Sequence, residues 1–168
     1  VLHFATHGAS AVKDRNDVKG AIATNLIGAI NLANAFIEFG GKCFINVGTS
    51  SEYGEKDHPI SENEILAPTS LYGITKAAAT LYCSNIAKEQ NLPIATIRLF
   101  SPFGYFEGTG RLMPAIIMAA LGHGSFEAPS PNIVRDSLFI DEVIDAFDIA
   151  IHNIQKIKGE VINIASGE

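Results

Sequence analysis

The stretch FINVGTSSEYG, residues 44–54, begins as an apolar strand and ends in a cluster of hydroxyl side chains and a glycine turn. The run from Cys43 to Val47 is predicted to be a buried strand, because short apolar runs bounded by turn residues are typical of one. In a parallel sheet, the carboxyl end of such a strand lies beside the ligand crevice. Hydroxyls at that point can hydrogen-bond a substrate oxygen as charge develops on it. A turn whose hydroxyls satisfy only their own backbone is the other interpretation of this pattern.

Helices and strands are predicted to alternate on both sides of this stretch. Apolar residues recur at helical spacing from Asp17 to Phe39. Ser70 can cap a second helix that runs to about Gln90. Short apolar runs from Val1 to Ala5 and from Ile94 to Phe100 are predicted to be strands. This order is typical of an α/β protein with a parallel sheet and right-handed crossovers.

The rhythm of the chain changes after Pro102, where a glycine-containing loop begins. The later elements are predicted to form a small cap over the sheet, with a return strand to the core. They are a helix from about Leu112 to Leu121, a strand near Ser137 to Ile140, a helix from Asp141 to about His152 and a strand from Val161 to Ile164. The predicted division is residues 1–105 for the sheet domain and residues 106–168 for the cap region.

Composition argues against several classes of partner. The 168 residues include 12 Lys and Arg and 18 Asp and Glu, so no basic face for a nucleic acid is expected. The two cysteines and five histidines are scattered, and no metal site is predicted. The longest apolar run, Leu112 to Leu121, is broken by Pro114 and falls short of the roughly 20 residues that span a bilayer. We therefore expect a soluble, cytoplasmic protein with no membrane partner.

Tyr72 and Lys76 lie four residues apart at the start of the second helix, on one helical face. A Tyr with a pKa of about 10 is a poor base at neutral pH, but a nearby cation favours its phenolate form. The pair can then exchange a proton with a hydroxyl while a hydride moves to or from a cofactor. A solvated pair on an amphipathic helix has the same spacing, and the upstream hydroxyl cluster at Thr49 is what favours chemistry.

These motifs together resemble those of the extended short-chain dehydrogenases/reductases, the NAD-dependent epimerase/dehydratase group, over essentially the whole chain. Leu2-His3-Phe4-Ala5 resembles the fourth strand of that family, and Thr24-Asn25-Leu26-Ile27-Gly28 resembles its Asn-containing helix motif. The segment from Arg98 to Gly104 resembles the strand and loop that pass the nicotinamide. Two further segments resemble those that hold a nucleotide diphosphate, and they run from Arg111 to Pro114 and from Arg135 to Asp141. The segment from Gly159 to Gly167 resembles the closing strand and turn of the family.

The resemblance implies a Rossmann-type parallel sheet, of which this chain carries the later strands, with a small C-terminal substrate-binding cap and bound NAD or NADP. It implies that Tyr72 is the general base or acid, that Lys76 orients the nicotinamide ribose and lowers the phenol pKa, and that Thr49 binds the reacting oxygen. The implied cofactor contacts are Phe4, Ala5, Asn25, Tyr72, Lys76 and Pro102. The implied substrate contacts are Ser50, Ser101, Arg111, Leu112 and Arg135, with the two arginines on the substrate phosphates.

The chain also departs from the family pattern. The glycine-rich phosphate loop of the family is absent from this chain, and in the family it lies upstream of the strand at which the chain begins. We therefore expect the chain to be truncated at its N-terminus and to bind the cofactor weakly by itself. Ser101 stands where many sugar epimerases have Asn. Sugar 4,6-dehydratases carry acidic residues where Ser50 and Ser51 stand. A shift of the alignment by one residue would place Glu52 at the position of the dehydratase glutamate.

The function predicted from this resemblance is an NAD(P)-dependent nucleotide-sugar epimerase or 4-keto reductase. Three alternatives remain: a nucleotide-sugar 4,6-dehydratase, an extended dehydrogenase of a non-nucleotide substrate such as a flavonoid or steroid, and a catalytically silent NAD(P)-sensing module. The expected partner is a nucleotide-diphosphate sugar. A homodimer is expected through the helices at residues 17–39 and 70–90, since both carry apolar residues beyond those that one sheet face needs.

Overall fold

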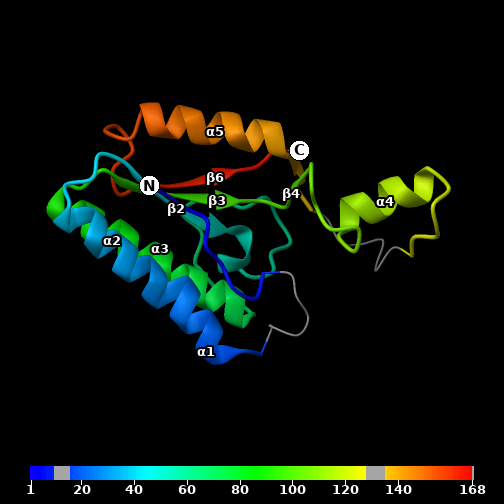
Figure 1. Ribbon diagram of the computed structural model, residues 1–168, viewed down its shortest axis with the longest axis horizontal. Coiled ribbons are helices and arrows are strands. Elements are labelled where there is room, and N and C mark those ends of the chain that lie inside the picture. The colour runs from blue at the N-terminus through cyan, green and yellow to red at the C-terminus, as the bar shows by residue number, and fades with distance from the viewer. Residues whose placement is uncertain (10–15, 128–134, 168) are drawn as a thin grey trace.

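The computed structural model describes residues 1–9, 16–127 and 135–167. Its centre is a four-stranded sheet in the order β1-β2-β3-β6, in which every pair of neighbours is parallel (Figure 1). The strands are β1 (Leu2–His3), β2 (Phe44–Thr49), β3 (Ile94–Leu99) and β6 (Val161–Ile164). The predicted parallel sheet is therefore confirmed, with strand ends within a few residues of the predicted ones.

Helices cover both faces of this sheet. A continuous helical segment lies beside α3 on one face, and α5 lies on the other (Figure 1). The continuous segment consists of α1 (Val18–Ala21), the π-helix η2 (Ile22–Gly28) and α2 (Ala29–Glu38); its partner is α3 (Leu71–Gln90) and the opposite helix is α5 (Ile140–His152). Asp17 and Ser70 cap the two long helices through their side chains, and the left-handed Asn91 ends α3. The predicted helices are confirmed, whereas the π-helical turns were not predicted.

The hydrophobic core has one cluster on each face of the sheet. Successive residues of β2 point to opposite faces, so Phe44 joins one cluster and Ile45 the other. Phe44 packs with Phe36 of α2 and Cys83 of α3. Ile45 shares its cluster with Phe147 of α5. Because both faces of β2 are covered, all six of its residues are buried.

The position of α5 differs from the sequence prediction, which assigned residues 141–152 to the cap. Val143, Phe147 and Ala150 recur at helical spacing and are all buried against the sheet. The path from β3 through α5 to β6 therefore ends in a further parallel strand of the main sheet. The substrate-binding role of residues 106–168 stays a prediction.

A second, two-stranded sheet lies at the carboxyl edge of the main sheet. It pairs β4 (Pro102–Phe103) with β5 (Leu138–Phe139) in parallel. The sequence analysis predicted the second of these strands and read the first as loop. The helix α4 (Leu112–Ala120) projects away from the main sheet and has no buried residue (Figure 1).

The helical segment Val18–Glu38 is long and apolar enough to cross a membrane by length and composition alone. This corrects the expectation that no segment reaches that length. Core helices of water-soluble proteins pass the same test. Here Ala29, Ala33 and Phe36 are buried within the fold.

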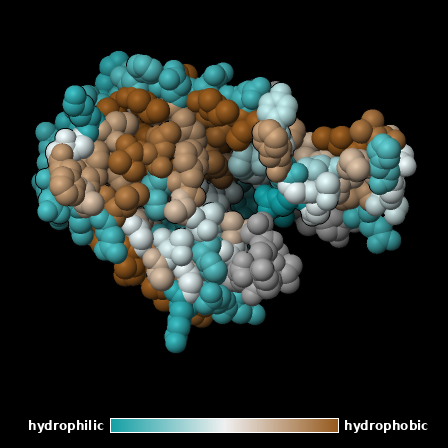
Figure 2. Space-filling view, in the orientation of Figure 1, coloured by the Kyte–Doolittle hydropathy of each residue, from teal (hydrophilic) through white to brown (hydrophobic). Residues whose placement is uncertain are grey.

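The outer edge of β1 has no strand partner among the described residues. Val1, Leu2 and Phe4 are about half exposed at this edge. Figure 2 shows an apolar surface in the same region, between α5 and α2. An unpaired apolar edge is a template for another strand.

Candidate active site

Thr49 ends β2 and is held in place by the turn that follows it. Its side chain accepts a hydrogen bond from the Ser51 amide at 3.3 Å and caps the short helix η3 (Ser50–Glu52). The Glu52 carboxylate in return accepts a hydrogen bond from the Thr49 amide at 2.9 Å. A side chain at Gly48 would collide with this carboxylate, since an added Cβ would lie 2.6 Å from it. The glycine therefore allows the turn to close tightly behind Thr49.

The start of α3 is packed against the same turn. The Ser70 hydroxyl accepts a hydrogen bond from the Gly73 amide at 3.0 Å. An added Cβ on Gly73 would lie 2.4 Å from the Ser51 carbonyl oxygen, so only glycine permits this approach of helix and turn. The first turn of α3 therefore lies directly over the carboxyl end of β2.

This packing brings Tyr72 to Thr49. Burial raises the pKa of Tyr72, and the side chains of Thr49, at the end of β2, and of Thr6, after β1, oppose the rise. At neutral pH the phenol is therefore protonated in this structure.

Lys76 lies one turn further along α3 and is only 2% exposed. Burial lowers the pKa of its ammonium group, while the negative charge of Glu52 raises it. Among the described residues, the Lys76 nitrogen is not one of the fully buried polar atoms that lack a hydrogen-bond partner. The lowering of the Tyr72 pKa by Lys76 stays a prediction, and the charge of Arg111 acts in the same direction.

Asn25, a predicted cofactor contact, makes several hydrogen bonds within the fold. It is fully buried, and its side chain accepts a hydrogen bond from the His7 amide at 2.8 Å. Its amide group donates to the His7 carbonyl at 3.0 Å and to the Thr75 hydroxyl at 2.9 Å. With its donors and acceptor occupied, Asn25 positions the loop after β1 against α3.

A buried polar network lies behind Thr49. Arg98 of β3 donates to Glu52 at 2.8 Å, and both side chains are almost completely buried. Arg98 also donates to the Tyr53 hydroxyl at 2.6 Å and lies over the Tyr53 ring. Tyr53 donates to Asn163 of β6 at 2.8 Å. This network was not predicted, since a carboxylate in a polar turn is usually exposed.

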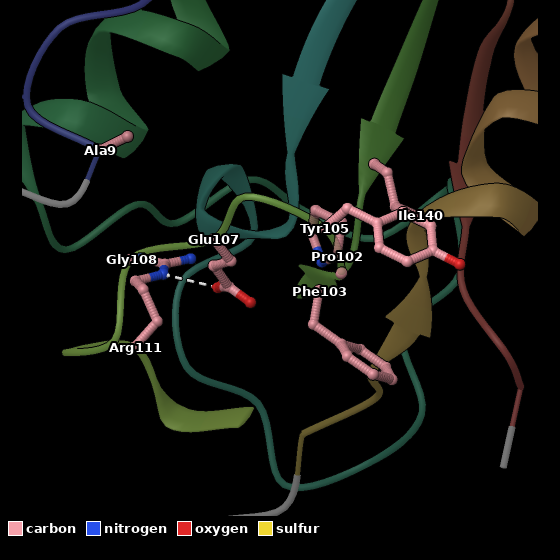
Figure 3. A pocket seen from close by; sticks show the side chains of 9 residues that line it. Ala9, Pro102, Phe103, Tyr105, Glu107, Gly108, Arg111 and Ile140 are labelled. Atoms are coloured by element: carbon pink, nitrogen blue, oxygen red, sulfur yellow. Dashed lines mark hydrogen bonds and ion pairs between the residues drawn. The ribbon is translucent and has the colours of Figure 1, made fainter. Parts of the chain in front are cut away.

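A pocket of about 350 Å³ lies at the same edge, beside β4 (Figure 3). Pro102, a predicted cofactor contact, and Arg111, a predicted substrate contact, both line it. Figure 3 shows Arg111 directed at Glu107, and the two side chains form an ion pair at 3.0 Å. Sequence reasoning missed Glu107, and it also missed Phe103 and Tyr105, whose rings pack edge-on against Phe139.

The other predicted contacts are spread around this region. Phe4, Ala5, Leu112 and Arg135 are exposed, and Ser50 and Ser101 are half-buried. Arg135 is not among the residues that line the pocket. The neighbouring Asp136 accepts hydrogen bonds from the amides of Ser166 and Gly167, both at 2.8 Å, and so ties this segment to the end of β6. In the described ranges, no group of three or more His, Cys, Asp or Glu side chains is suited to a metal ion.

Comparison with known proteins matches residues 1–165 to the family model described as the NAD dependent epimerase/dehydratase family. A UDP-glucose 4-epimerase of Corynebacterium glutamicum is 26% identical, over all of this chain and 56% of its own length. The low-salt glycan biosynthesis protein Agl12 of Haloferax volcanii is 29% identical over 87% of this chain and 47% of its own length. The chain thus spans about half the length of these two curated relatives.

Solved structures give the same result for the fold. A UDP-glucuronic acid 4-epimerase from Bacillus cereus in complex with NAD is 27% identical, with a TM-score of 0.86 over 99% of this chain and 54% of that one. A UDP-N-acetylglucosamine 4-epimerase from Methanobrevibacter ruminantium M1 is 25% identical, with a TM-score of 0.89 over 100% of this chain and 55% of that one. The predicted Rossmann-type fold class is confirmed.

The positioning role of Asn25 can be tested by Asn25→Ala. The change leaves the His7 amide and carbonyl without their buried partner, and we expect a loss of about 1–3 kcal/mol in the free energy of unfolding. Urea denaturation followed by circular dichroism measures it. Asn34→Ala is the matched control, because Asn34 is an exposed residue of α2 that accepts a hydrogen bond from Tyr82. Equal losses in the two variants would contradict the assignment.

Proposed function

The chain belongs to the NAD dependent epimerase/dehydratase family, and on that premise we propose that the protein is a nucleotide-sugar epimerase or 4-keto reductase. The cofactor is NAD or NADP. The observation that carries the proposal is the placement of Tyr72 beside Thr49 at the carboxyl end of the sheet, where the Thr49 side chain acts to lower the pKa of the phenol. Relatives named for the epimerisation of UDP-sugars support the substrate class.

The buried Lys76 supports a cofactor at this place. Lys76 is almost completely buried and lies on the same face of α3 as Tyr72, where the hydroxyls of a ribose could accept hydrogen bonds from its ammonium group. Thr6 and Ala5 follow β1 on the same side of the sheet, where a parallel sheet binds its ligands. When bound, NAD(P) supplies the hydride acceptor or donor.

In the proposed mechanism, Tyr72 exchanges a proton with the hydroxyl or keto oxygen of the sugar. Its raised pKa keeps the phenol protonated, which suits donation to a keto oxygen during reduction. Removal of a proton from a sugar hydroxyl is the reverse step and needs the phenolate, which the charge of Arg111 favours. Thr49 donates a hydrogen bond to the same oxygen and holds it in line.

The dehydratase alternative is disfavoured by the state of Glu52. Its carboxylate is fully buried and accepts hydrogen bonds from Thr49, Thr80 and Arg98, so it is not free to act on a substrate. Ser50 and Ser51 stand in the places where the dehydratases carry acidic residues. The silent-module alternative leaves the joint presence of Thr49, Tyr72 and Lys76 unexplained, and a non-nucleotide substrate would make Arg135 dispensable.

The unpaired edge of β1 supports a further part of the cofactor domain in the intact enzyme. We propose that another strand pairs with β1 and covers the apolar residues Leu2 and Phe4. The glycine-rich phosphate loop would lie in that part, so this chain alone would bind NAD(P) weakly. We also propose that the protein is cytoplasmic and works without a membrane or nucleic-acid partner.

A homodimer is the proposed assembly, because apolar residues of the long helices are exposed. Val18, Ile22, Ile27 and Leu32 on the first helical segment, and Ile74 and Leu81 on α3, are all more than a third exposed. An isologous contact of this surface would remove them from water. Leu81→Glu should therefore convert a dimer into a monomer in light scattering of the full-length protein at micromolar concentration. Ile149→Glu, on the exposed side of α5, is the control and should leave the dimer intact. A monomeric wild type would refute the proposal.

Tyr72→Phe tests the catalytic assignment in the full-length enzyme. Only the proton path is lost, so turnover should fall by about a hundredfold or more while cofactor affinity stays nearly unchanged. Steady-state kinetics and cofactor titration measure the two effects. The control is Tyr82→Phe on the same helix, whose hydroxyl contacts Asn34 and lies outside the site. Equal loss of cofactor binding, or full activity of Tyr72→Phe, would count against the assignment.

Arg135→Ala tests the substrate class. A nucleotide sugar carries a diphosphate, and an acidic protein needs a local cation to receive it. We expect the Michaelis constant to rise by roughly ten- to a hundredfold, about 1.5–3 kcal/mol, with a smaller change in turnover. Lys88→Ala, an exposed cation on α3, should change neither constant. If Arg135→Ala keeps its affinity for every nucleotide sugar tried, the nucleotide-sugar proposal fails and a non-nucleotide alcohol becomes the better candidate.

A further inference from the structure

We infer that Glu52 is a positioning residue for the proposed reaction: its carboxylate, paired with Arg98, fixes the end of β2 to the catalytic face of α3. The inference rests on the proposed function of Thr49, Tyr72 and Lys76. Glu52 itself is fully buried and does not reach a substrate.

One carboxylate oxygen joins the two elements that carry the site. Glu52 Oε1 accepts a hydrogen bond from the Thr49 amide at 2.9 Å and another from the Thr80 hydroxyl at 3.1 Å. Residues four apart share a helical face, so Tyr72, Lys76 and Thr80 form one stripe along α3. A single acceptor therefore sets the distance between Thr49 and the stripe that carries the phenol and the ammonium.

The other carboxylate oxygen is held by Arg98. Its Nε donates to Glu52 Oε2 at 2.8 Å, and its guanidinium lies 4.5 Å from the centre of the Tyr53 ring. Tyr53 is anchored in turn to Asn163 of β6. Because Arg98 and Tyr53 are themselves buried and bonded, Glu52 has no freedom to turn away from Thr49.

The charge of Glu52 also acts on the site. Burial is the largest influence on both pKa values, and the negative charge of Glu52 acts to raise the pKa of Tyr72 and that of Lys76. The other charged or titratable groups that face this pair are His3 of β1, Cys83 of α3 and Arg111 at the start of α4.

Glu52→Gln in the full-length enzyme is the test. The amide oxygen can still accept from Thr49 and Thr80, but the negative charge is gone. Because that charge raises the pKa of Tyr72, the Tyr72-dependent limb of the pH–kcat profile should move to lower pH. The ionisation of Tyr72, followed by tyrosinate absorbance and isolated by subtracting the matching Tyr72→Phe protein, should move in the same direction.

Two further variants control for folding and for distance. The double variant Glu52→Gln/Arg98→Met removes both buried charges. It therefore leaves no unpaired buried cation, and it serves as the test if the single variant does not fold. The titration of Tyr72 in the double variant should again lie at lower pH. Glu62→Gln changes an exposed carboxylate that accepts from the Asn163 amide at 2.9 Å, at the far side of the network, and should leave the titration of Tyr72 in place.

The outcomes separate this inference from the proposed function. If Tyr72 titrates at the wild-type pH in both Glu52 variants, or if Glu62→Gln moves it as far, the positioning role of Glu52 is wrong. If the titration moves as expected but the full-length enzyme turns over no nucleotide sugar, the proposed function fails and the role of Glu52 in setting Tyr72 stands.

Discussion

The buried ion pair between Arg98 and Glu52 is the interaction on which the arrangement of the site depends. It joins β3 to the turn after β2, and the hydrogen bonds that surround it extend to α3 through Thr80 and to β6 through Tyr53. Removing one partner of such a pair typically costs about 3–5 kcal/mol, because the other charge is left buried and unpaired. The folded state therefore depends on this ion pair, and the pair in turn determines the position of Thr49.

One part of the site is buried and fixed, and another part is more exposed. Tyr72, Thr49 and Lys76 are set by buried contacts from β2 and α3, and Asn25 fixes the loop after β1 against the same helix. Arg111 and Glu107, in contrast, form a partly exposed ion pair beside the pocket. Proton exchange needs fixed distances, whereas a large nucleotide-linked sugar must enter and leave. A site with a buried catalytic part and an exposed substrate-binding part suits the proposed reaction of such a substrate.

The sequence predicted those features that depend on local pattern. Helical spacing located the two long helices, Ser70 was recognised as the cap of the second, and the strand from Cys43 to Val47 was expected to end beside the ligand crevice. The features that depend on tertiary contacts were not predictable in this way. The apolar spacing of α5 predicts a helix with one buried face, but it does not indicate which surface that face packs against. The short segments β4 and β5 are strands only because they pair with each other. Likewise, nothing local distinguishes the buried Glu52 from an exposed carboxylate in a turn, or shows that the amide of Asn25 is already occupied.

We propose that these residues support hydride transfer between a nucleotide sugar and bound NAD(P). The most direct test gives the full-length, NAD-loaded enzyme a nucleotide sugar with deuterium on the carbon to be oxidised, and determines the mass of the cofactor released after rapid quenching. We expect deuterium to appear on the nicotinamide ring. Deuterium lost to water, with an unlabelled cofactor throughout the reaction, would contradict it.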